Sequence, residues 1–134
     1  MKVIAFRPDP EKMFYAIYDG MLQESSWIDS PNMIESIRAL KYPNHLVIIE
    51  NRKYRDGILA TPAQRRSYAL IAGALMMKFP RHKLIKPRDW EPVGNRFKTL
   101  SLVFGVLGDN ELLDVAGMAK WGYENNKVSL TDFV

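Results

Sequence analysis

The sequence predicts an α/β protein with a mixed five-stranded sheet flanked by helices, and three observations lead to that prediction. The first is the run 45–52, in which four apolar residues are followed directly by Glu50. An apolar run of this length between turn signals is typical of a strand buried on both faces, in the middle of a sheet. The second is a β-rich opening with a hairpin signal at Asp19-Gly20. The third is a set of capped helical patterns along the rest of the chain.

An antiparallel three-stranded opening is expected to be followed by alternating helices and strands, in the order β-β-β-α-β-α-β-α-α. Pro8 and Pro10 interrupt the first strand, because proline removes a ladder donor. The pair Ser30-Pro31 is typical of a helix start, and Thr61 with Gln64 fits a capping box. In chain order we expect strands at 2–6, 13–18 and 21–28, a helix from Ser30, a strand ending at Glu50, a helix at 62–78, a strand at 82–86, a helix at 97–107, and a last helix from Asp109 or Asn110.

Length and composition bound the possibilities further. The chain has 134 residues, of which 47% are apolar, so we expect one domain at 1–124 and a loose C-terminal tail at 125–134. The absence of cysteine excludes disulfides and thiolate metal sites. Because no window resembles a membrane helix or a signal peptide, we expect a cytoplasmic protein with no membrane partner. A net charge of +4 is compatible with a nucleic-acid partner.

Carboxylates occur in three places where they could meet. Asp9 follows the first strand, Glu50 ends the fourth, and Glu111 and Asp114 lie three apart on the last helix, which puts both on one helix face. Carboxylates at the carboxyl ends of strands stand where α/β sheets usually bind ligands. Such a set would suit two divalent cations that activate water for phosphodiester cleavage.

Each carboxylate also has an ordinary structural explanation. Glu50 could be a strand-end residue turned to water and paired with Arg52 or Lys53. Glu111 could serve the helix dipole, because acids near a helix start are favourable. Asp114 could be a solvated helix residue, although Val115 beside it belongs to an apolar pattern.

The order of these features resembles the RuvC-like Holliday junction resolvases of the ribonuclease H-like superfamily, especially their short phage-type members. The resemblance spans about residues 2–122, and no single motif in it is specific. The matching segments are the strand end and second strand at 7–16, the apolar strand with its acid at 47–51, a helix with small residues at 67–75, Pro-x-x-Trp at 87–90 with Lys98 nearby, and the acidic helix at 111–116.

That resemblance implies a ribonuclease H-like fold and a metal-dependent endonuclease that cuts branched DNA with Mg²⁺ or Mn²⁺. It implies Asp9, Glu50, Glu111 and Asp114 as catalytic residues, with Glu50 and Asp114 as metal ligands if the site is active. It also implies a homodimer, for which the helix at 62–78 is a plausible contact, and a bacterial host cytoplasm if the protein is phage-encoded.

One departure bears on all of these implications. Counted back from Tyr15-Ala16, the first catalytic Asp of the family falls on Arg7 rather than on Asp9. A guanidinium is permanently charged and cannot ligate a cation. If Arg7 points into the site, it would take the place of the cation and pair with Glu50 and Asp114. Asp9 could restore the site only through a shift of two residues, which keeps the strand face.

Basic and aromatic side chains suggest where DNA could bind. Around such a site positive side chains would neutralise phosphates, although they could equally be solvated surface residues. His45 and His82 are expected to be structural, and Trp90 is the tryptophan whose role is most open. The candidate DNA-binding residues are Arg52, Lys53, Arg55, Arg65, Arg66, Lys86 and Arg88, with Lys83 close by.

Three functional hypotheses remain open on this sequence. The first is a RuvC-like protein with a weakened or lost metal site that binds branched DNA or a protein partner. The second is an active Mg²⁺-dependent junction endonuclease. The third is a pure protein-interaction module on the same fold.

Overall fold

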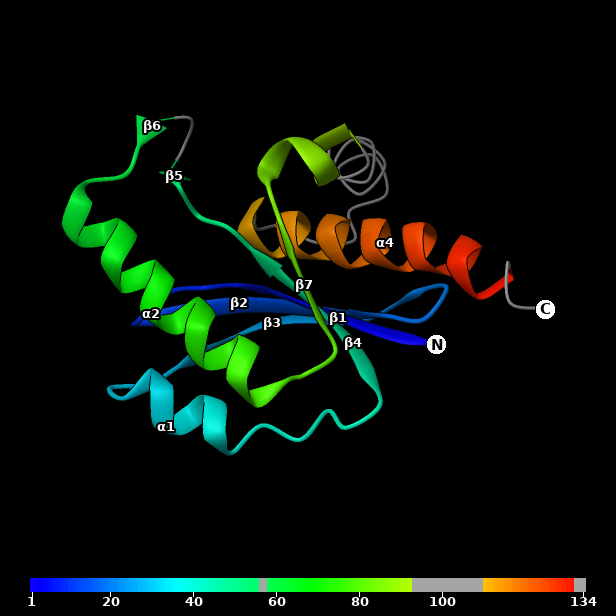
Figure 1. Cartoon of the computed structure of the whole chain (residues 1–134), viewed down its shortest axis with the longest axis horizontal. Helices are drawn as coiled ribbons and strands as arrows, with labels where there is room; N and C mark the ends of the chain where they lie inside the picture. The colour runs from blue at the N-terminus through cyan, green and yellow to red at the C-terminus, as the bar shows by residue number, and fades with distance from the viewer. Residues whose placement is uncertain (56–57, 93–109, 132–134) are drawn as a thin grey trace.

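The computed structural model describes residues 1–55, 58–92 and 110–131, and it forms one mixed sheet with helices on both faces (Figure 1). A small second sheet is made by the hairpin β5–β6. In chain order the elements are β1 (Lys2–Arg7), β2 (Lys12–Tyr18), β3 (Leu22–Asp29), α1 (Met33–Arg38), β4 (His45–Glu50), β5 (Tyr54–Arg55), β6 (Ile58–Leu59), α2 (Pro62–Lys78), β7 (His82–Ile85) and α4 (Asn110–Thr131).

The main sheet has the strand order β3-β2-β1-β4-β7. β1 pairs antiparallel with β2, and Arg7 lies opposite Phe14. On its other side β1 pairs parallel with β4, with Phe6 opposite Ile49, so β1 and β4 end beside each other. β4 has a neighbour on both sides, because β7 also runs parallel to it. The predicted strand that ends at Glu50 is therefore an interior strand, as expected.

Side chains of the central strands point alternately to the two faces of the sheet, and each face has its own hydrophobic core. On β1, Val3 and Ala5 face α4, whereas Ile4 and Phe6 face the side covered by α1 and α2. Side chains of a strand alternate between faces with a period of two. Arg7 therefore continues the row that faces α4. By the same count on β4, Glu50 follows the row of Leu46 and Ile48, which also faces α4.

Helix α4 lies close against the sheet (Figure 1). A Cβ atom on Gly122 would come within 2.7 Å of the Ile48 Cγ1 atom, so the close approach of α4 to β4 requires glycine there. Near the start of the helix, the Ser25 hydroxyl of β3 donates to the Leu112 carbonyl at 2.7 Å. These contacts fix the first turns of α4 over the ends of the strands, where the candidate carboxylates lie.

The prediction for α2 is confirmed in its bounds and in its cap. The Thr61 side chain accepts from the Gln64 amide, and the Gln64 side chain accepts from the Thr61 amide. The prediction for α1 was wrong by two residues. Its N-cap is Asn32, whose side chain accepts a hydrogen bond from the Glu35 amide. The Ser30 hydroxyl accepts from the Asn32 amide, in the turn that precedes the helix.

Three further differences lie beyond Glu50, and one expectation there falls outside the described residues. The hairpin β5–β6 was not expected, because its strands have only two residues each. Residues 87–92 are helical, since Asp89 accepts from the Lys86 amide and so caps that turn. The helix expected at 97–107 lies outside the described residues. α4 continues to Thr131 where a loose tail was expected from 125, because no glycine or proline follows Gly122 to stop it.

Among the described residues, no helix is both long enough and apolar enough to span a membrane.

Candidate functional site

The adjoining ends of β1 and β4 bring Arg7 and Glu50 together beneath the first turns of α4. The Arg7 Nε atom donates to Glu50 Oε1 at 2.8 Å, and its Nη2 atom donates to Glu50 Oε2 at 3.1 Å. The Arg7 Nη1 atom donates to Asp114 Oδ2 at 2.9 Å and lies 3.5 Å from Glu111 Oε2. The expectation that an inward-pointing Arg7 pairs with Glu50 and Asp114 is therefore confirmed. We call these four residues the Arg7 cluster.

Burial places the Arg7–Glu50 pair in a low-dielectric environment, whereas the side chains of Asp114 and Glu111 are 16% and 39% exposed. The side chain of Arg7 is 11% exposed and that of Glu50 is 4% exposed. Burial alone would lower the pKa of Arg7, but Glu50, and then Asp114 and Glu111, raise its pKa above the ordinary value. Arg7 therefore stays charged across the ordinary pH range, as arginine side chains in proteins do. The planar, two-pronged contact with Glu50 is the strongest geometry available to an arginine–carboxylate pair.

Trp90 adds a neutral donor to this cluster. Its indole Nε1 atom donates to Glu50 Oε2 at 3.1 Å, and the Arg7 guanidinium carbon lies 6.0 Å from the ring centroid. Trp90 is 3% exposed, so it is a packing residue here and offers no face for stacking. The sequence did not show this bond, although a buried indole N–H usually finds a partner.

The Arg7 cluster does not fit a divalent cation. Mg²⁺ and Mn²⁺ bind carboxylate oxygens, yet both oxygens of Glu50 accept hydrogen bonds from Arg7, and one of them accepts another from Trp90. The guanidinium stands between Glu50 and Asp114, where its fixed positive charge would repel a cation. Within the described part of the chain, no group of three or more His, Cys, Asp or Glu side chains is arranged to hold a metal ion.

Asp9 belongs to a second, separate pair. Its Oδ2 atom accepts from the Arg52 Nη1 atom at 3.1 Å, and its Oδ1 atom accepts from the backbone amides of Glu11 and Lys12. The Arg52 guanidinium also lies 4.4 Å from the Tyr68 ring centroid. β1 ends at Arg7, so the shift of two residues that would bring Asp9 into the site does not occur.

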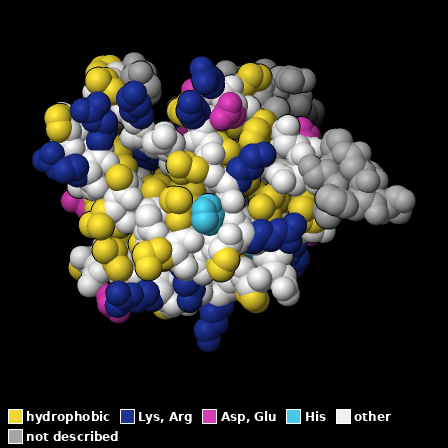
Figure 2. Space-filling model, viewed as in Figure 1, with side chains coloured by type: hydrophobic (Ala, Val, Ile, Leu, Met, Phe, Trp, Pro, Cys, Tyr) yellow, Lys and Arg dark blue, Asp and Glu magenta, His cyan; other side chains and the backbone are white. Residues whose placement is uncertain are grey.

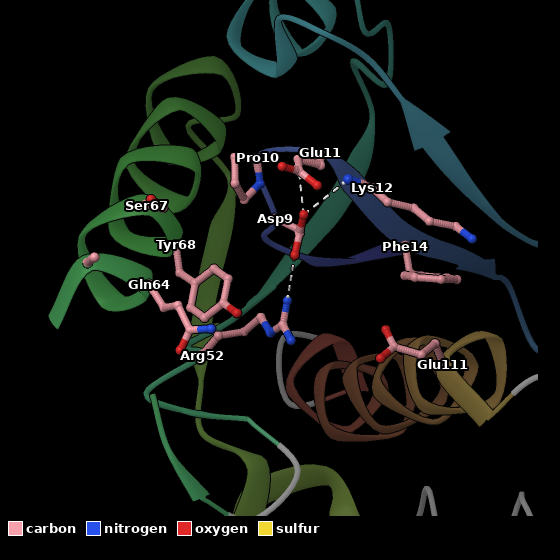
Figure 3. A pocket seen from close by; sticks show the side chains of 11 residues that line it. Asp9, Pro10, Glu11, Lys12, Phe14, Arg52, Gln64, Ser67, Tyr68 and Glu111 are labelled. Atoms are coloured by element: carbon pink, nitrogen blue, oxygen red, sulfur yellow. Dashed lines mark hydrogen bonds and ion pairs between the residues drawn. The ribbon is translucent and has the colours of Figure 1, made fainter. Parts of the chain in front are cut away.

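A pocket of about 450 Å³ opens between this second pair and the Arg7 cluster (Figure 3). In Figure 3, Arg52 and Tyr68 form one wall, Lys12 and Phe14 lie on the opposite side, and Glu111 lies on α4 below them. Helix α2 contributes the Tyr68 ring and, beside it, small or polar side chains. We call this space the Tyr68 pocket; it is lined by Asp9, Pro10, Glu11, Lys12, Phe14, Arg52, Ala63, Gln64, Ser67, Tyr68 and Glu111.

The candidate DNA-binding residues divide by exposure. Arg52 is largely buried by its two contacts, Arg65 is half-buried, and the side chain of Arg55 lies outside the described residues. The exposed ones are Lys53, Arg66, Lys86 and Arg88, with Lys83. In Figure 2, Lys and Arg side chains gather around the start of α2 and again across a notch, near the end of β7.

The two histidines occupy structural positions, as expected. The His82 Nδ1 atom lies 2.7 Å from the Phe79 carbonyl oxygen. The His45 ring packs edge-on against Tyr42, and its buried Nδ1 atom has no hydrogen-bond partner among the described residues. Burial, with the charge of Lys2, lowers the pKa of His45 below its ordinary value.

Comparison with known proteins supports the fold that the sequence predicted. No family model matches the chain, and no curated protein matches it. Among solved structures, the chain is similar to T. thermophilus RuvC in complex with a Holliday junction substrate, with a TM-score of 0.68 and 11% identity. The match covers 90% of this chain and 91% of that one. The predicted ribonuclease H-like, RuvC-like fold is thereby confirmed, and at this identity the likeness concerns the fold alone.

Proposed function

We propose that this protein binds branched DNA on a RuvC-like fold and does not cut it by a metal-dependent route. The observation that carries the proposal is the position of Arg7, whose guanidinium lies within 3.1 Å of Glu50 and Asp114 oxygens. The structurally similar RuvC is bound to a Holliday junction, which supports the choice of branched DNA as ligand.

The loss of cleavage follows from charge. Metal-assisted phosphodiester cleavage needs carboxylates that are free to hold cations beside the attacking and leaving oxygens. Here one fixed positive charge is hydrogen-bonded to the same carboxylates, and it can neither activate water nor exchange with solvent. The fold is thus kept while the place of the cation is filled by a side chain.

The binding of DNA rests on the distribution of exposed cations. The chain carries a net charge of +4, and exposed Lys and Arg side chains lie on both sides of the notch described above. Cations that neutralise phosphates release counterions, so affinity should fall steeply with salt. Lys86 and Arg88 are exposed just after β7, and Trp90, two residues beyond Arg88, donates to Glu50 of the Arg7 cluster.

The test is fluorescence anisotropy with a labelled four-way junction and a linear duplex, titrated between about 50 and 200 mM salt. We expect tighter binding of the junction, with an affinity that falls by at least about tenfold over this range. The double variant Lys86→Gln/Arg88→Gln should bind more weakly with a shallower salt slope. Arg38→Gln, an exposed cation on α1, is the matched control. Failure to bind the junction, or equal affinity for the duplex, would overturn the proposal.

We also propose a homodimer, as the resemblance implies, with α2 as the contact. Its outer surface carries Leu70 and Met77, which are 62% and 87% exposed. A Cβ atom on Gly73 between them would meet nothing within 4 Å, so packing within the described chain does not require glycine there. Light scattering measures the molar mass in solution of the wild type and of the Leu70→Glu variant. A dimer that the variant converts to monomer is expected, and a monomeric wild type would contradict it.

A further inference from the structure

The Tyr68 pocket continues onto an exposed tryptophan at the edge of the sheet. Trp27 lies on β3 and is 42% exposed, although large aromatic side chains are usually mostly buried. Its ring centroid lies 6.1 Å from that of Phe14, and Phe14 lines the pocket. Lys12 also connects the pocket with Trp27, because it lines the pocket and its ammonium lies 4.5 Å from the Trp27 ring centroid.

The chemistry of this surface is that of single-stranded nucleic-acid sites. Such sites combine aromatic rings, on which bases stack, with cations that follow the phosphates. Here Arg52 and Lys12 are the cations, and Trp27, which is 42% exposed, is the ring that a base can reach. Tyr68 and Phe14 are each 7% exposed and lie behind Arg52 and Lys12, at the two ends of a pocket of about 450 Å³. That volume lies in the range of small-molecule sites. Gln64 and Ser67 place polar groups at its wall, where the edge of a base could be read.

We propose that the Tyr68 pocket and Trp27 together bind an unpaired DNA strand, with one nucleotide in the pocket and a neighbouring base against Trp27. This deepens the proposed binding of branched DNA and rests on it. A base inside a duplex is stacked and paired, so a concave pocket of this size cannot reach its faces unless the base is unstacked. Arg52 and Lys12 supply the positive charges for the adjoining phosphates. Of the three carboxylates that line the pocket, Asp9 is bonded to Arg52, Glu111 lies 3.5 Å from Arg7, and Glu11 is exposed to solvent.

The roles of Arg52 and Asp9 follow from their pairing. Arg52 uses its Nη1 atom for Asp9 and for the Pro8 carbonyl, at 3.1 and 3.3 Å. Its Nε and Nη2 atoms make no hydrogen bond to other described residues, and its side chain is 10% exposed on a pocket wall. Asp9 and Tyr68 therefore hold the guanidinium in one place, while part of its donor set remains available to a phosphate.

The first experiment measures binding of a fluorescein-labelled oligothymidylate to the full chain. We expect binding accompanied by quenching of tryptophan fluorescence, because Trp27 is exposed, whereas Trp90 is buried and Trp121 is half-buried. Trp27→Ala should weaken oligothymidylate binding by about tenfold and remove most of the quenching, since stacking on one base is worth that much. Trp27→Phe keeps a ring and should retain most of the affinity.

A second variant blocks the pocket without touching Trp27. Ser67 lines the pocket with a small side chain, so Ser67→Leu should fill part of it and reduce oligothymidylate affinity by about tenfold. Ala69→Leu, two residues further along α2 and exposed outside the pocket, is the matched control and should bind as the wild type does. Circular dichroism of each variant establishes that the fold is kept.

The outcomes separate this inference from the proposed function. Loss of oligothymidylate affinity in Trp27→Ala and Ser67→Leu, with both controls unchanged, supports the unpaired-strand site. If the junction is bound but these two variants bind oligothymidylate as the wild type does, the inference is overturned and the proposed function stands. If neither DNA is bound, both fail.

Discussion

Two arginine–carboxylate pairs lie at the same end of the sheet, and they differ in what surrounds the carboxylate. The arginines are equally buried, with Arg7 at 11% and Arg52 at 10% side-chain exposure. Their partners are not, because Glu50 is 4% exposed whereas Asp9 is 25% exposed. Glu50 has Arg7 and Trp90 around it, while Asp9 borders an open pocket and has two backbone amides of its own.

The same end of the sheet therefore holds two kinds of arginine–carboxylate pair. We call Arg7–Glu50 the closed pair, because donors surround Glu50, and Arg52–Asp9 the open pair, because it borders the Tyr68 pocket. In the Arg7 cluster a guanidinium satisfies carboxylates that would otherwise need a cation, and it leaves Glu50 no oxygen without a donor. In the second pair the guanidinium is clamped at one edge, and the Tyr68 pocket stays accessible beside it. Arg7 therefore compensates the charge of its carboxylates, whereas Arg52 is the arginine for which we propose ligand contact.

The largest effect on stability should come from breaking the closed pair. Arg7→Leu leaves Glu50 buried without its charged partner, and we expect a loss of about 3–5 kcal/mol in the free energy of unfolding. Urea denaturation followed by circular dichroism measures it. The double variant Arg7→Leu/Glu50→Leu should recover part of the loss, because removing both charges is far less unfavourable than stranding one. No recovery would mean that Arg7 contributes mainly through packing.

Arg7→Asp should turn the closed site into a cation-dependent one. The new carboxylate would stand beside Glu50 and Asp114, so mutual repulsion destabilises the variant until a cation binds. With Mn²⁺ at about a hundred times its dissociation constant, binding should return about 2.7 kcal/mol, which thermal unfolding detects as an upward shift. The wild type is the control and should not shift. An unresponsive variant would show that the remaining carboxylates cannot assemble a site.

Breaking the open pair should have a smaller effect. Arg52→Leu removes the contact with Asp9 and the stacking on Tyr68, and we expect a loss of about 1 kcal/mol, because Asp9 keeps water and two amide donors. Arg38→Ala is the baseline, since its pair with Glu35 is fully at the surface. A loss for Arg52→Leu as large as that for Arg7→Leu would remove the distinction between the two pairs.

The smallest effect concerns pH and lies away from both pairs. Arg7 stays charged, so it gives no pH dependence of its own. The pKa of His45 is lowered in the folded state, so its contribution to stability is full above its unfolded pKa and is lost as pH falls through its folded pKa. We expect a slightly lower urea midpoint at about pH 5.5 than at pH 8, with the difference reduced in His45→Leu. An unchanged difference would assign the effect to other groups.

Much of the fold could be predicted because its strongest signals are local. The interior strand β4 was visible as an apolar run, and α2 was visible from a capping box that the structure reproduces. The start of α1 was misplaced because Ser30 and Asn32 both fit an N-cap, and only the fold decides which one caps. The hairpin β5–β6 is too short to show a periodic pattern.

The sequence predicted that Arg7 meets Glu50 and Asp114, but it did not predict that Asp9 forms a separate pair with Arg52. Arg7, Glu50 and Asp114 were expected to meet, since their positions follow from strand ends and a helix face. The pairing of Asp9 with Arg52, and the bond from Trp90 to Glu50, join segments about forty residues apart. Neither leaves a local signal, because both depend on how the loops after β1, β4 and β7 meet in space.

The most direct test of the proposed role of Arg7 is incubation of the wild-type protein with an end-labelled four-way junction and Mn²⁺, beside Glu50→Gln. We expect both proteins to bind the junction on a native gel and to leave it uncut on a denaturing gel. Cleavage by the wild type that is abolished in Glu50→Gln would contradict the proposal, because it would show that Glu50 serves a working metal site despite its bonds to Arg7.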